Sequence, residues 1–156
     1  MPKSASPKIY LLNNVDTNRF TRACVGCLVL SQDNKIVLQQ RDDNCHRFPG
    51  ALATFGGGIE PGESPMQALI RELKEELGAN VQAADVISLG ALTETETNFR
   101  EVVYVYFWHD KKGTITGCYE GKANYYSNPL DALKHRKVMN DVRWTLQECK
   151  KKKLLK

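Results

Sequence analysis

Three glutamates, Glu72, Glu75 and Glu76, lie close together in the segment RELKEEL near the middle of the chain. On an α-helix, residues three and four positions apart are neighbours, so these carboxylates crowd along one side of the helix. Like charges at this spacing repel one another, and a cation bound among them relieves the repulsion. Carboxylate oxygens suit Mg²⁺ or Mn²⁺ better than zinc. The spacing therefore predicts a site for Mg²⁺ or Mn²⁺, although a solvated acidic helix face has the same pattern.

The residues before these glutamates suit phosphate chemistry. Gly56, Gly57 and Gly58 carry no side chains, which lets the backbone approach a bulky charged group. Glu63 can fold toward the glutamates, and Arg71 can hold one carboxylate through paired hydrogen bonds. A metal site, a glycine loop and an orienting arginine together indicate phosphoryl chemistry, in which the metal neutralises phosphate charge and lowers the pKa of a bound water.

The helix that carries the glutamates is well marked in the sequence. Ser64 can cap it, Pro65 suits its first position, Gln67 completes a capping box, and Gly78 stops it. We therefore predict a helix over Pro65–Leu77. Its buried stripe is predicted to consist of Met66, Leu69, Ile70, Leu73 and Leu77.

The rest of the chain mixes strands and helices. Strands are predicted over residues 22–30 and 35–40, as a hairpin, and over 81–92, 101–109, 114–119 and 123–127, with helices over 130–134 and 138–153 and a loop over 41–62. These elements do not follow a regular βαβ rhythm. The pattern favours an α/β sandwich with a mixed sheet over a doubly wound parallel sheet.

Length and composition are those of an ordinary globular protein. The 156 residues, of which 42% are hydrophobic and 26% charged, suit one domain over 1–156, with residues 1–8 loose and a basic tail over 150–156. The longest apolar run, Val102–Trp108, is far too short for a membrane span, and the start has no signal-like apolar stretch. We therefore expect a cytoplasmic protein that does not enter a membrane. The five cysteines are expected to be free thiols, including Cys24 and Cys27, which point to opposite faces of a strand.

The segment Gly57–Ala79 resembles the Nudix box of the Nudix (MutT-like) hydrolases, G-x5-E-x7-R-E-U-x-E-E-x-G-U, where U is apolar. Every fixed position matches: Gly57, Glu63, Arg71, Glu72, Leu73, Glu75, Glu76, Gly78 and Ala79. The resemblance implies the Nudix α/β/α sandwich. It also implies attack by water on a phosphorus of a nucleoside diphosphate linked to another group, such as a nucleoside triphosphate or a nucleotide sugar.

The resemblance also implies roles for individual residues. The divalent metals would be bound by Glu72, Glu75 and Glu76, with Glu63 completing the site. Arg71 would orient a glutamate. Glu72 is our choice of general base within the box, and Glu120 is the leading candidate outside it for an extra ligand or base. Weaker candidates outside the box are Glu94, Glu96 and Glu101.

Substrate contacts are expected from residues near the glycine loop. Arg41 and Arg47 flank the loop and are candidates for contacts to terminal phosphates or a sugar. Phe48 and Phe55 are candidates for stacking on a nucleobase. Many relatives have proline at the position of Phe55, so the stiffness of this loop can differ here. The strand residues Tyr104, Tyr106 and Trp108 share one face and are interpreted first as core.

Two alternatives to an enzyme of free nucleotides remain. The run Lys150–Lys153 can hold a polyanion by charge, which leaves an enzyme that removes pyrophosphate from RNA ends, or a non-catalytic nucleotide- or RNA-binding module. The intact glutamates favour the enzyme, because a binding module has no need of so costly a cluster of charges. A homodimer is compatible with the resemblance.

Overall fold

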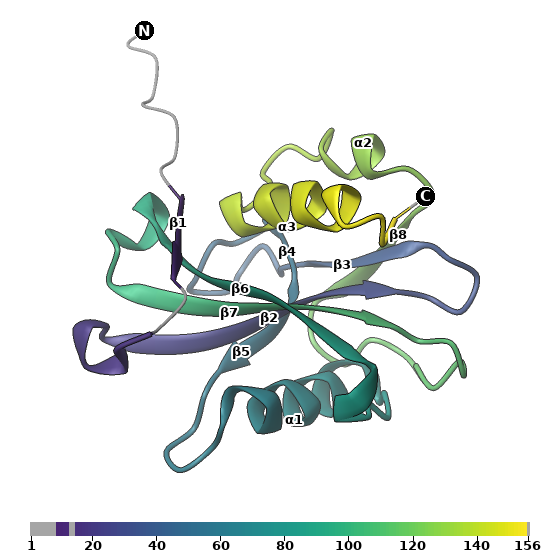
Figure 1. Ribbon diagram of the computed structural model, residues 1–156. Coiled ribbons are helices and arrows are strands. Elements are labelled where there is room, and N and C mark those ends of the chain that lie inside the picture. Colours follow the sequence, from purple (N-terminus) through teal and green to yellow (C-terminus); the bar gives the residue numbers. More distant parts are fainter. Residues whose placement is uncertain (1–8, 13–14, 156) are drawn as a thin grey trace, which may run out of the picture.

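Two strands, β2 (Arg22–Leu30) and β7 (Glu101–His109), run parallel to each other through the centre of a mixed sheet (Figure 1). Nine residue pairs join them in register, from Arg22 beside Glu101 to Leu30 beside His109. The computed structural model describes residues 9–12 and 15–155, so the expected loose start at residues 1–8 lies outside the described residues.

The other paired strands run antiparallel to their neighbours. The order across the sheet is β1-β6-β7-β2-β3-β4, while β5 pairs with β2 and β8 pairs with β3. The bounds of these strands are Ile9–Leu12 (β1), Ile36–Gln40 (β3), Leu52–Ala53 (β4), Phe55–Gly58 (β5), Val86–Glu94 (β6) and Lys122–Tyr126 (β8).

Helices cover both faces of the sheet. Helix α1 (Pro65–Leu77) lies on one face, and α2 (Pro129–Ala132) and α3 (Asn140–Lys151) lie on the other (Figure 1). Strand β2 serves both layers because successive side chains point to opposite faces. Cys27 packs in the core under α1, and Leu28 packs in the core under α3. The predicted α/β/α sandwich with a mixed sheet is thus confirmed.

Helix α1 has the predicted bounds and caps. Ser64 Oγ accepts a hydrogen bond from Gln67 N, and Gln67 Oε1 accepts one from Ser64 N, which completes the capping box. Gly78 ends the helix in the left-handed conformation that glycine adopts at low cost. Leu69 and Leu73 are fully buried in the core under the helix. The helix therefore fixes the direction in which each box glutamate points.

Several predicted boundaries were wrong, for local reasons. Residues 114–119 form no strand, because Thr116 N and Tyr119 N bond to carbonyls at the end of α1. The strand predicted over 81–92 starts only at Val86, since residues 83–85 form a 3-10 turn. The predicted loop over 41–62 contains the strands β4 and β5, and three of the four residues of β5 are glycines, which disfavour strands.

Other predictions about packing are confirmed. Tyr106 and Trp108 are buried under α1, and Tyr104 packs against the same core. The described cysteines are free, and Cys24 and Cys27 pack as part of a strand. Among the helices in the described part of the chain, none combines the length and apolar character that a bilayer span requires.

Candidate active site

The three glutamates of α1 have very different surroundings. The side chain of Glu75 is 58% exposed and that of Glu72 is 12% exposed, while Glu76 as a residue is only 1% exposed. Lys74, between them in sequence, turns away and binds Asn80. Lys74 is therefore not placed to neutralise the three carboxylates, as the helix geometry predicts.

Arg71 is the centre of a hydrogen-bond network that links the helix to the loop before it. Its guanidinium contacts Glu63 twice, at 2.7 and 2.9 Å, and Glu72 Oε1 at 2.8 Å. It also reaches Glu75 Oε2 at 3.4 Å and donates to the carbonyl oxygen of Gly58 at 3.0 Å. The hydrogen bonds from Arg71 hold the pKa of Glu63 down to about 2. The expected orienting role of Arg71 fits this network.

Glu76 points from the helix toward the sheet. Its Oε1 accepts a hydrogen bond from Gly56 N at 3.1 Å, and its Oε2 accepts one from Gln39 Nε2 at 3.2 Å. Burial, then a hydrogen bond with the Glu72 carboxyl and the nearby charges of Glu120 and Glu72, together raise the pKa of Glu76 to about 9. A buried carboxyl in this state is a group whose ionised form a nearby positive charge would stabilise.

The three glycines belong to strand β5 rather than to a free loop, and Gly56 and Gly57 pack against the glutamates. A Cβ added at Gly57 would lie 2.6 Å from Glu72 Oε1, and one added at Gly58 would lie 3.3 Å from an Arg22 nitrogen. Any larger residue at position 57 would displace the carboxylate. The absence of side chains therefore brings β5 against Glu72 and Glu76.

The carboxylates do not stand as a ready set of metal ligands. Among residues 9–12 and 15–155, no three acidic, histidine or cysteine side chains converge closely enough to form one. The carboxylates do not converge because they have other hydrogen-bond partners. Arg71 donates to Glu63, Glu72 and Glu75. Glu76 instead accepts from the backbone N–H of Gly56. Their oxygen donors are nevertheless of the kind that Mg²⁺ and Mn²⁺ prefer.

The candidate glutamates outside the box are divided between two places. Glu120 is exposed and close enough to Glu76 to raise the pKa of that carboxyl. Glu94 and Glu96 instead bond to Asn140 at the start of α3. Glu101 pairs with Arg47 through two hydrogen bonds of 2.7 and 3.0 Å. Glu120 thus remains the best placed of the four.

A cleft opens beside the glycine strand. The residues that line it include Arg22, Cys24, Val25, Arg41, Arg47, Phe48, Ala53, Thr54, Gly56, Gly57, Leu92, Glu94, Thr97, Glu101, Val103, Met139 and Asp141. The expected substrate residues Arg41, Arg47 and Phe48 are all in this set. Arg41 Nε also donates to the carbonyl oxygen of Arg47 at 2.7 Å, which ties the loop together.

The prediction that Phe55 stacks on a nucleobase was wrong. The side chain is fully buried in the core under α1, because its strand β5 pairs with β2 and directs this ring inward. It has no free face on which a nucleobase can stack.

Arg22, Thr54 and Asp141 line the cleft, and the sequence analysis missed all three. Arg22 reads as a surface charge at the start of a strand. Only the parallel register of β2 and β7 brings it to Glu101, at 3.7 Å. Asp141 comes from the opposite end of the sequence, and no local pattern connects it to the box.

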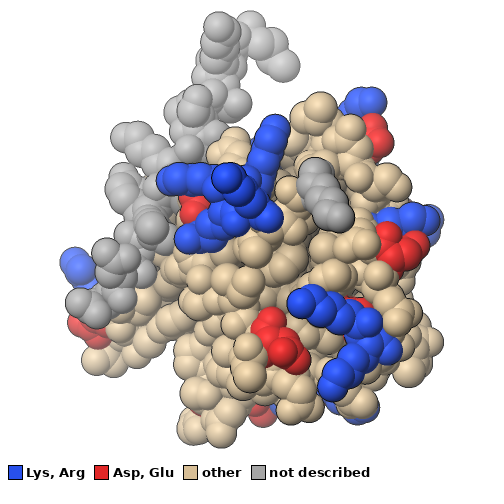
Figure 2. Space-filling model, turned by 45° about the vertical axis from the view of Figure 1, so that its right-hand side comes forward, with Lys and Arg blue, Asp and Glu red and all other residues tan. Residues whose placement is uncertain are grey.

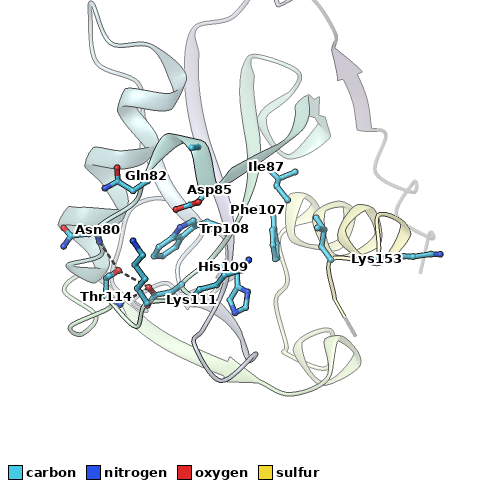
Figure 3. A pocket seen from close by; sticks show the side chains of 14 residues that line it. Asn80, Gln82, Asp85, Ile87, Phe107, Trp108, His109, Lys111, Thr114 and Lys153 are labelled. Atoms are coloured by element: carbon cyan, nitrogen blue, oxygen red, sulfur yellow. Dashed lines mark hydrogen bonds between the residues drawn. The ribbon is translucent and has the colours of Figure 1, made fainter.

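A larger cavity, of about 740 Å³, lies elsewhere (Figure 3). It is lined by residues at the end of β7, including His109, by Ile87 of β6, and by Lys153 and Leu154, which follow α3. In Figure 3 the side chain of Lys153 extends away from the other labelled side chains. None of the predicted site residues is among the residues that line this cavity.

Comparison with known proteins identifies the protein family to which the chain is similar. A model of the family described as NUDIX domain matches residues 20–146. The chain is 32% identical over 120 residues to the CTP pyrophosphohydrolase of Escherichia coli, which covers 76% of this chain and 84% of that protein. It is 42% identical over 62 residues to the nucleoside triphosphatase NudI of Salmonella arizonae, a match that covers 40% of this chain and only 44% of that protein.

A solved structure supports the fold. It is that of a bifunctional NMN adenylyltransferase/ADP ribose pyrophosphatase from Francisella tularensis, complexed with AMP and a manganese ion. The TM-score is 0.66 at 20% sequence identity, and the match covers 84% of this chain and 41% of that one. Since the family model spans most of the chain and the Escherichia coli relative is covered over most of its length, the chain belongs to the Nudix (MutT-like) hydrolases, a family of pyrophosphohydrolases that act on nucleotide derivatives.

Proposed function

We propose that this protein hydrolyses a phosphoanhydride bond in a nucleoside triphosphate, with Mg²⁺ or Mn²⁺ bound at the box glutamates. The contact between α1 and the glycine strand carries the proposal. Gly56 N donates to Glu76 at 3.1 Å, and Gly57 leaves room for Glu72. The same two glycines line the cleft. Substrate in the cleft would therefore lie directly against the carboxylate cluster.

The residues present fit a divalent cation. Glu72 and Glu76 supply oxygen ligands close together, with Glu75, Glu63 and Glu120 nearby. No basic side chain in the described part of the chain pairs with the buried carboxyl of Glu76. A bound Mg²⁺ or Mn²⁺ would neutralise phosphate charge and lower the pKa of a water. The Francisella tularensis structure, which contains a manganese ion, supports the choice of metal through the shared fold.

The chain's own residues have separate tasks in this proposal. Arg71 positions Glu63 and Glu72, and Glu72 takes a proton from the attacking water as general base. The glycine strand lets phosphate groups approach the backbone. Arg22, Arg41 and Arg47 line the cleft and supply positive charge for the phosphates.

Two relatives support the choice of substrate class. The matched proteins of Escherichia coli and Salmonella arizonae are a CTP pyrophosphohydrolase and a nucleoside triphosphatase. Nucleotide sugars and other nucleoside diphosphate derivatives are the next class to consider.

Release of phosphate and pyrophosphate from a panel of nucleotides tests the proposal, with Mg²⁺ and again with excess chelator. The panel contains the common nucleoside triphosphates, an oxidised guanine triphosphate, ADP-ribose, nucleotide sugars and diadenosine polyphosphates. We expect metal-dependent turnover of a nucleoside triphosphate. Glu76→Gln should lower that turnover by about a thousandfold or more, since it removes a charged ligand while the fold is kept.

Glu148→Gln, the same change on α3, is the matched control and should keep full activity. Turnover by Glu76→Gln at the rate of the unchanged protein would contradict the metal assignment. Silence across the whole panel would contradict the substrate class.

The alternative of RNA ends has one feature in its favour, the exposed run Lys150–Lys153. On the face shown in Figure 2, however, basic side chains stand in small groups with acidic ones nearby and form no continuous band. We therefore rank RNA ends below free nucleotides as the substrate. The single domain over 1–156, the homodimer and the cytoplasmic location stay predictions.

A further inference from the structure

The side chain of Gln39 joins two parts of the site that are far apart in sequence. Gln39 belongs to β3 and is only 4% exposed. Its Nε2 donates to Glu76 Oε2 at 3.2 Å and to the carbonyl oxygen of Glu120 at 3.0 Å. A side-chain amide nitrogen carries two N–H donors. One buried residue therefore holds a box glutamate and the backbone of the loop that carries Glu120.

The turn after Glu120 is shaped to approach Gln39. Gly121 has a φ of 67°, and a Cβ added there would lie 2.7 Å from the carbonyl oxygen of Gln40 and 3.2 Å from Gln39 Cγ. Backbone cannot move aside for such a contact, so the turn needs glycine. Strand β8 then pairs with β3, starting with Lys122 beside Gln40. The turn and this pairing bring the carbonyl oxygen of Glu120 to Gln39.

The loop before Glu120 is also attached at its near end. Residues 113–121 form neither helix nor strand, so single contacts fix their position. Tyr119 N donates to the carbonyl oxygen of Glu76 at 2.8 Å, and Cys118 Sγ donates to that of Glu120 at 3.2 Å. The backbone of this loop is thus held between the end of α1 and the amide of Gln39.

Electrostatic repulsion gives this attachment a purpose. The carboxylates of Glu76 and Glu120 are close enough for the charge of one to act on the other, and like charges repel. Gln39 offsets the repulsion by donating to both residues at once. An apolar side chain of similar size would fill the same space, but it could not donate, and Glu76 would lose one hydrogen-bond partner.

We propose that Gln39 is a positioning residue that ties the Glu120 loop to Glu76 and so keeps both glutamates at the divalent-cation site. This inference rests on the proposed function. Gln39 acts through its two partners, because its amide donors are used by Glu76 and Glu120. Residues that orient metal ligands commonly change metal affinity by about 10- to 100-fold when they are replaced.

Calorimetric titration with Mn²⁺, without nucleotide, tests this inference. Gln39→Met keeps the length of the side chain but removes its donors, and it should weaken Mn²⁺ binding by about tenfold or more. In Glu120→Gln the same loop keeps its attachment but loses its charge. Because both changes act on one contact, the loss in the double variant should be smaller than the product of the two single losses. Gln147→Met, on the exposed side of α3, is the control and should bind Mn²⁺ normally.

The position of the loop has its own readout in the metal-free protein. Cys118 should react with a maleimide about tenfold faster in Gln39→Met, because the loop opens more often. The partly exposed Cys45 is the internal reference, and mass spectrometry of peptides distinguishes the two thiols. Gly121→Ala pushes the turn away while Gln39 and Glu76 stay intact, so it should give the same increase. Circular dichroism establishes that each variant is folded.

The outcomes separate this inference from the proposed function. Mn²⁺ binding that depends on Gln39, together with silence across the nucleotide panel, would support the role of Gln39 and contradict the substrate. Unchanged Mn²⁺ binding or unchanged Cys118 labelling in Gln39→Met would overturn the role of Gln39 even if turnover is normal. Losses that multiply fully in the double variant would overturn the connection to Glu120. A failure of the unchanged protein to bind Mn²⁺ would overturn both proposals.

Discussion

Arg71 donates two hydrogen bonds to the carboxylate of Glu63, from Nε to Oε2 at 2.7 Å and from Nη2 to Oε1 at 2.9 Å. The two residues are eight positions apart and belong to different elements, since Glu63 precedes the cap of α1 and Arg71 lies within the helix. The pair therefore sets the position of the loop relative to the glutamates.

Replacing Arg71 with lysine tests the importance of this geometry. Lysine keeps the charge, but it cannot form the paired bonds to Glu63 while also contacting Glu72 and the carbonyl oxygen of Gly58. We expect kcat to fall by about 10- to 100-fold, with a higher Mg²⁺ concentration needed for half-maximal rate. Rate measurements across a Mg²⁺ titration give both values. Arg143→Lys, on the exposed side of α3, is the control; equal kinetics for the two variants would refute the positioning role.

The capping box predicts a stability effect. Ser64 Oγ accepts from Gln67 N at 3.1 Å, and Ser64→Ala leaves that amide without its partner. The free energy of unfolding should fall by about 1 kcal/mol. Denaturant titration measures it, with the exposed Ser127→Ala as a comparison that should change little. A loss at Ser64 no larger than at Ser127 would show that the cap contributes nothing.

Asp141 gives a pH dependence of stability. Burial, followed by the nearby charge of Glu94, raises its pKa to about 6 from an ordinary value of 3.8. Between these two values the folded state binds more protons than the unfolded state, so stability falls as pH rises through that window and is then constant.

Asp141→Asn should remove this dependence. Relative to the variant, the unchanged protein should lose on the order of 2 kcal/mol of unfolding free energy between pH 4 and pH 7. Glu94 and Glu96 face the same start of α3 and are present in both proteins, so the difference isolates Asp141. Parallel curves for the two proteins across this range would count against the assignment.

The lysine tail should not affect turnover of small substrates. Lys153 and His109 line the cavity at one end of β7, whereas Glu101 lines the cleft at the other end, about 26 Å away. Replacing Lys150–Lys153 with glutamine should change kcat/KM for nucleotides by less than about twofold. Deletion is a poorer test, because Leu154 and Leu155 pack against the core under α3. Weaker binding of RNA by the glutamine variant would support the RNA alternative, and unchanged RNA binding would remove it.

The sequence was most informative where local signals coincide. Ser64, Gln67 and Gly78 define the ends of α1, and the helix repeat then places every box residue. Strands β2 and β7 were also predicted with correct bounds, since β-branched and aromatic residues dominate β7 and β2 is a nearly continuous apolar run after Arg22.

Contacts between segments that are far apart in the chain could not be predicted from the sequence. The glycines of β5 read as a loop because glycine disfavours strands, and only the pairing with β2 makes them one. The burial of Phe55 follows from the same pairing. Asp141 and Arg22 reach the cleft through the packing of α3 and the register of β2 with β7. None of these contacts leaves a mark within a short window of sequence.

One edge of β2 has two different neighbours along its length. Residues Cys24–Cys27 pair with β5, whereas Val29 and Leu30 pair with β3. The first branch leads to the glycines and the glutamate helix, and the second leads toward the loop of Arg47 and Phe48. With the function proposed here, bond cleavage belongs to the first branch, and the second branch leads to Arg47 and Phe48, which line the cleft where the substrate would lie. Substitutions on the second branch can then change substrate range without disturbing catalysis, which is a route by which such a protein acquires new substrates in evolution.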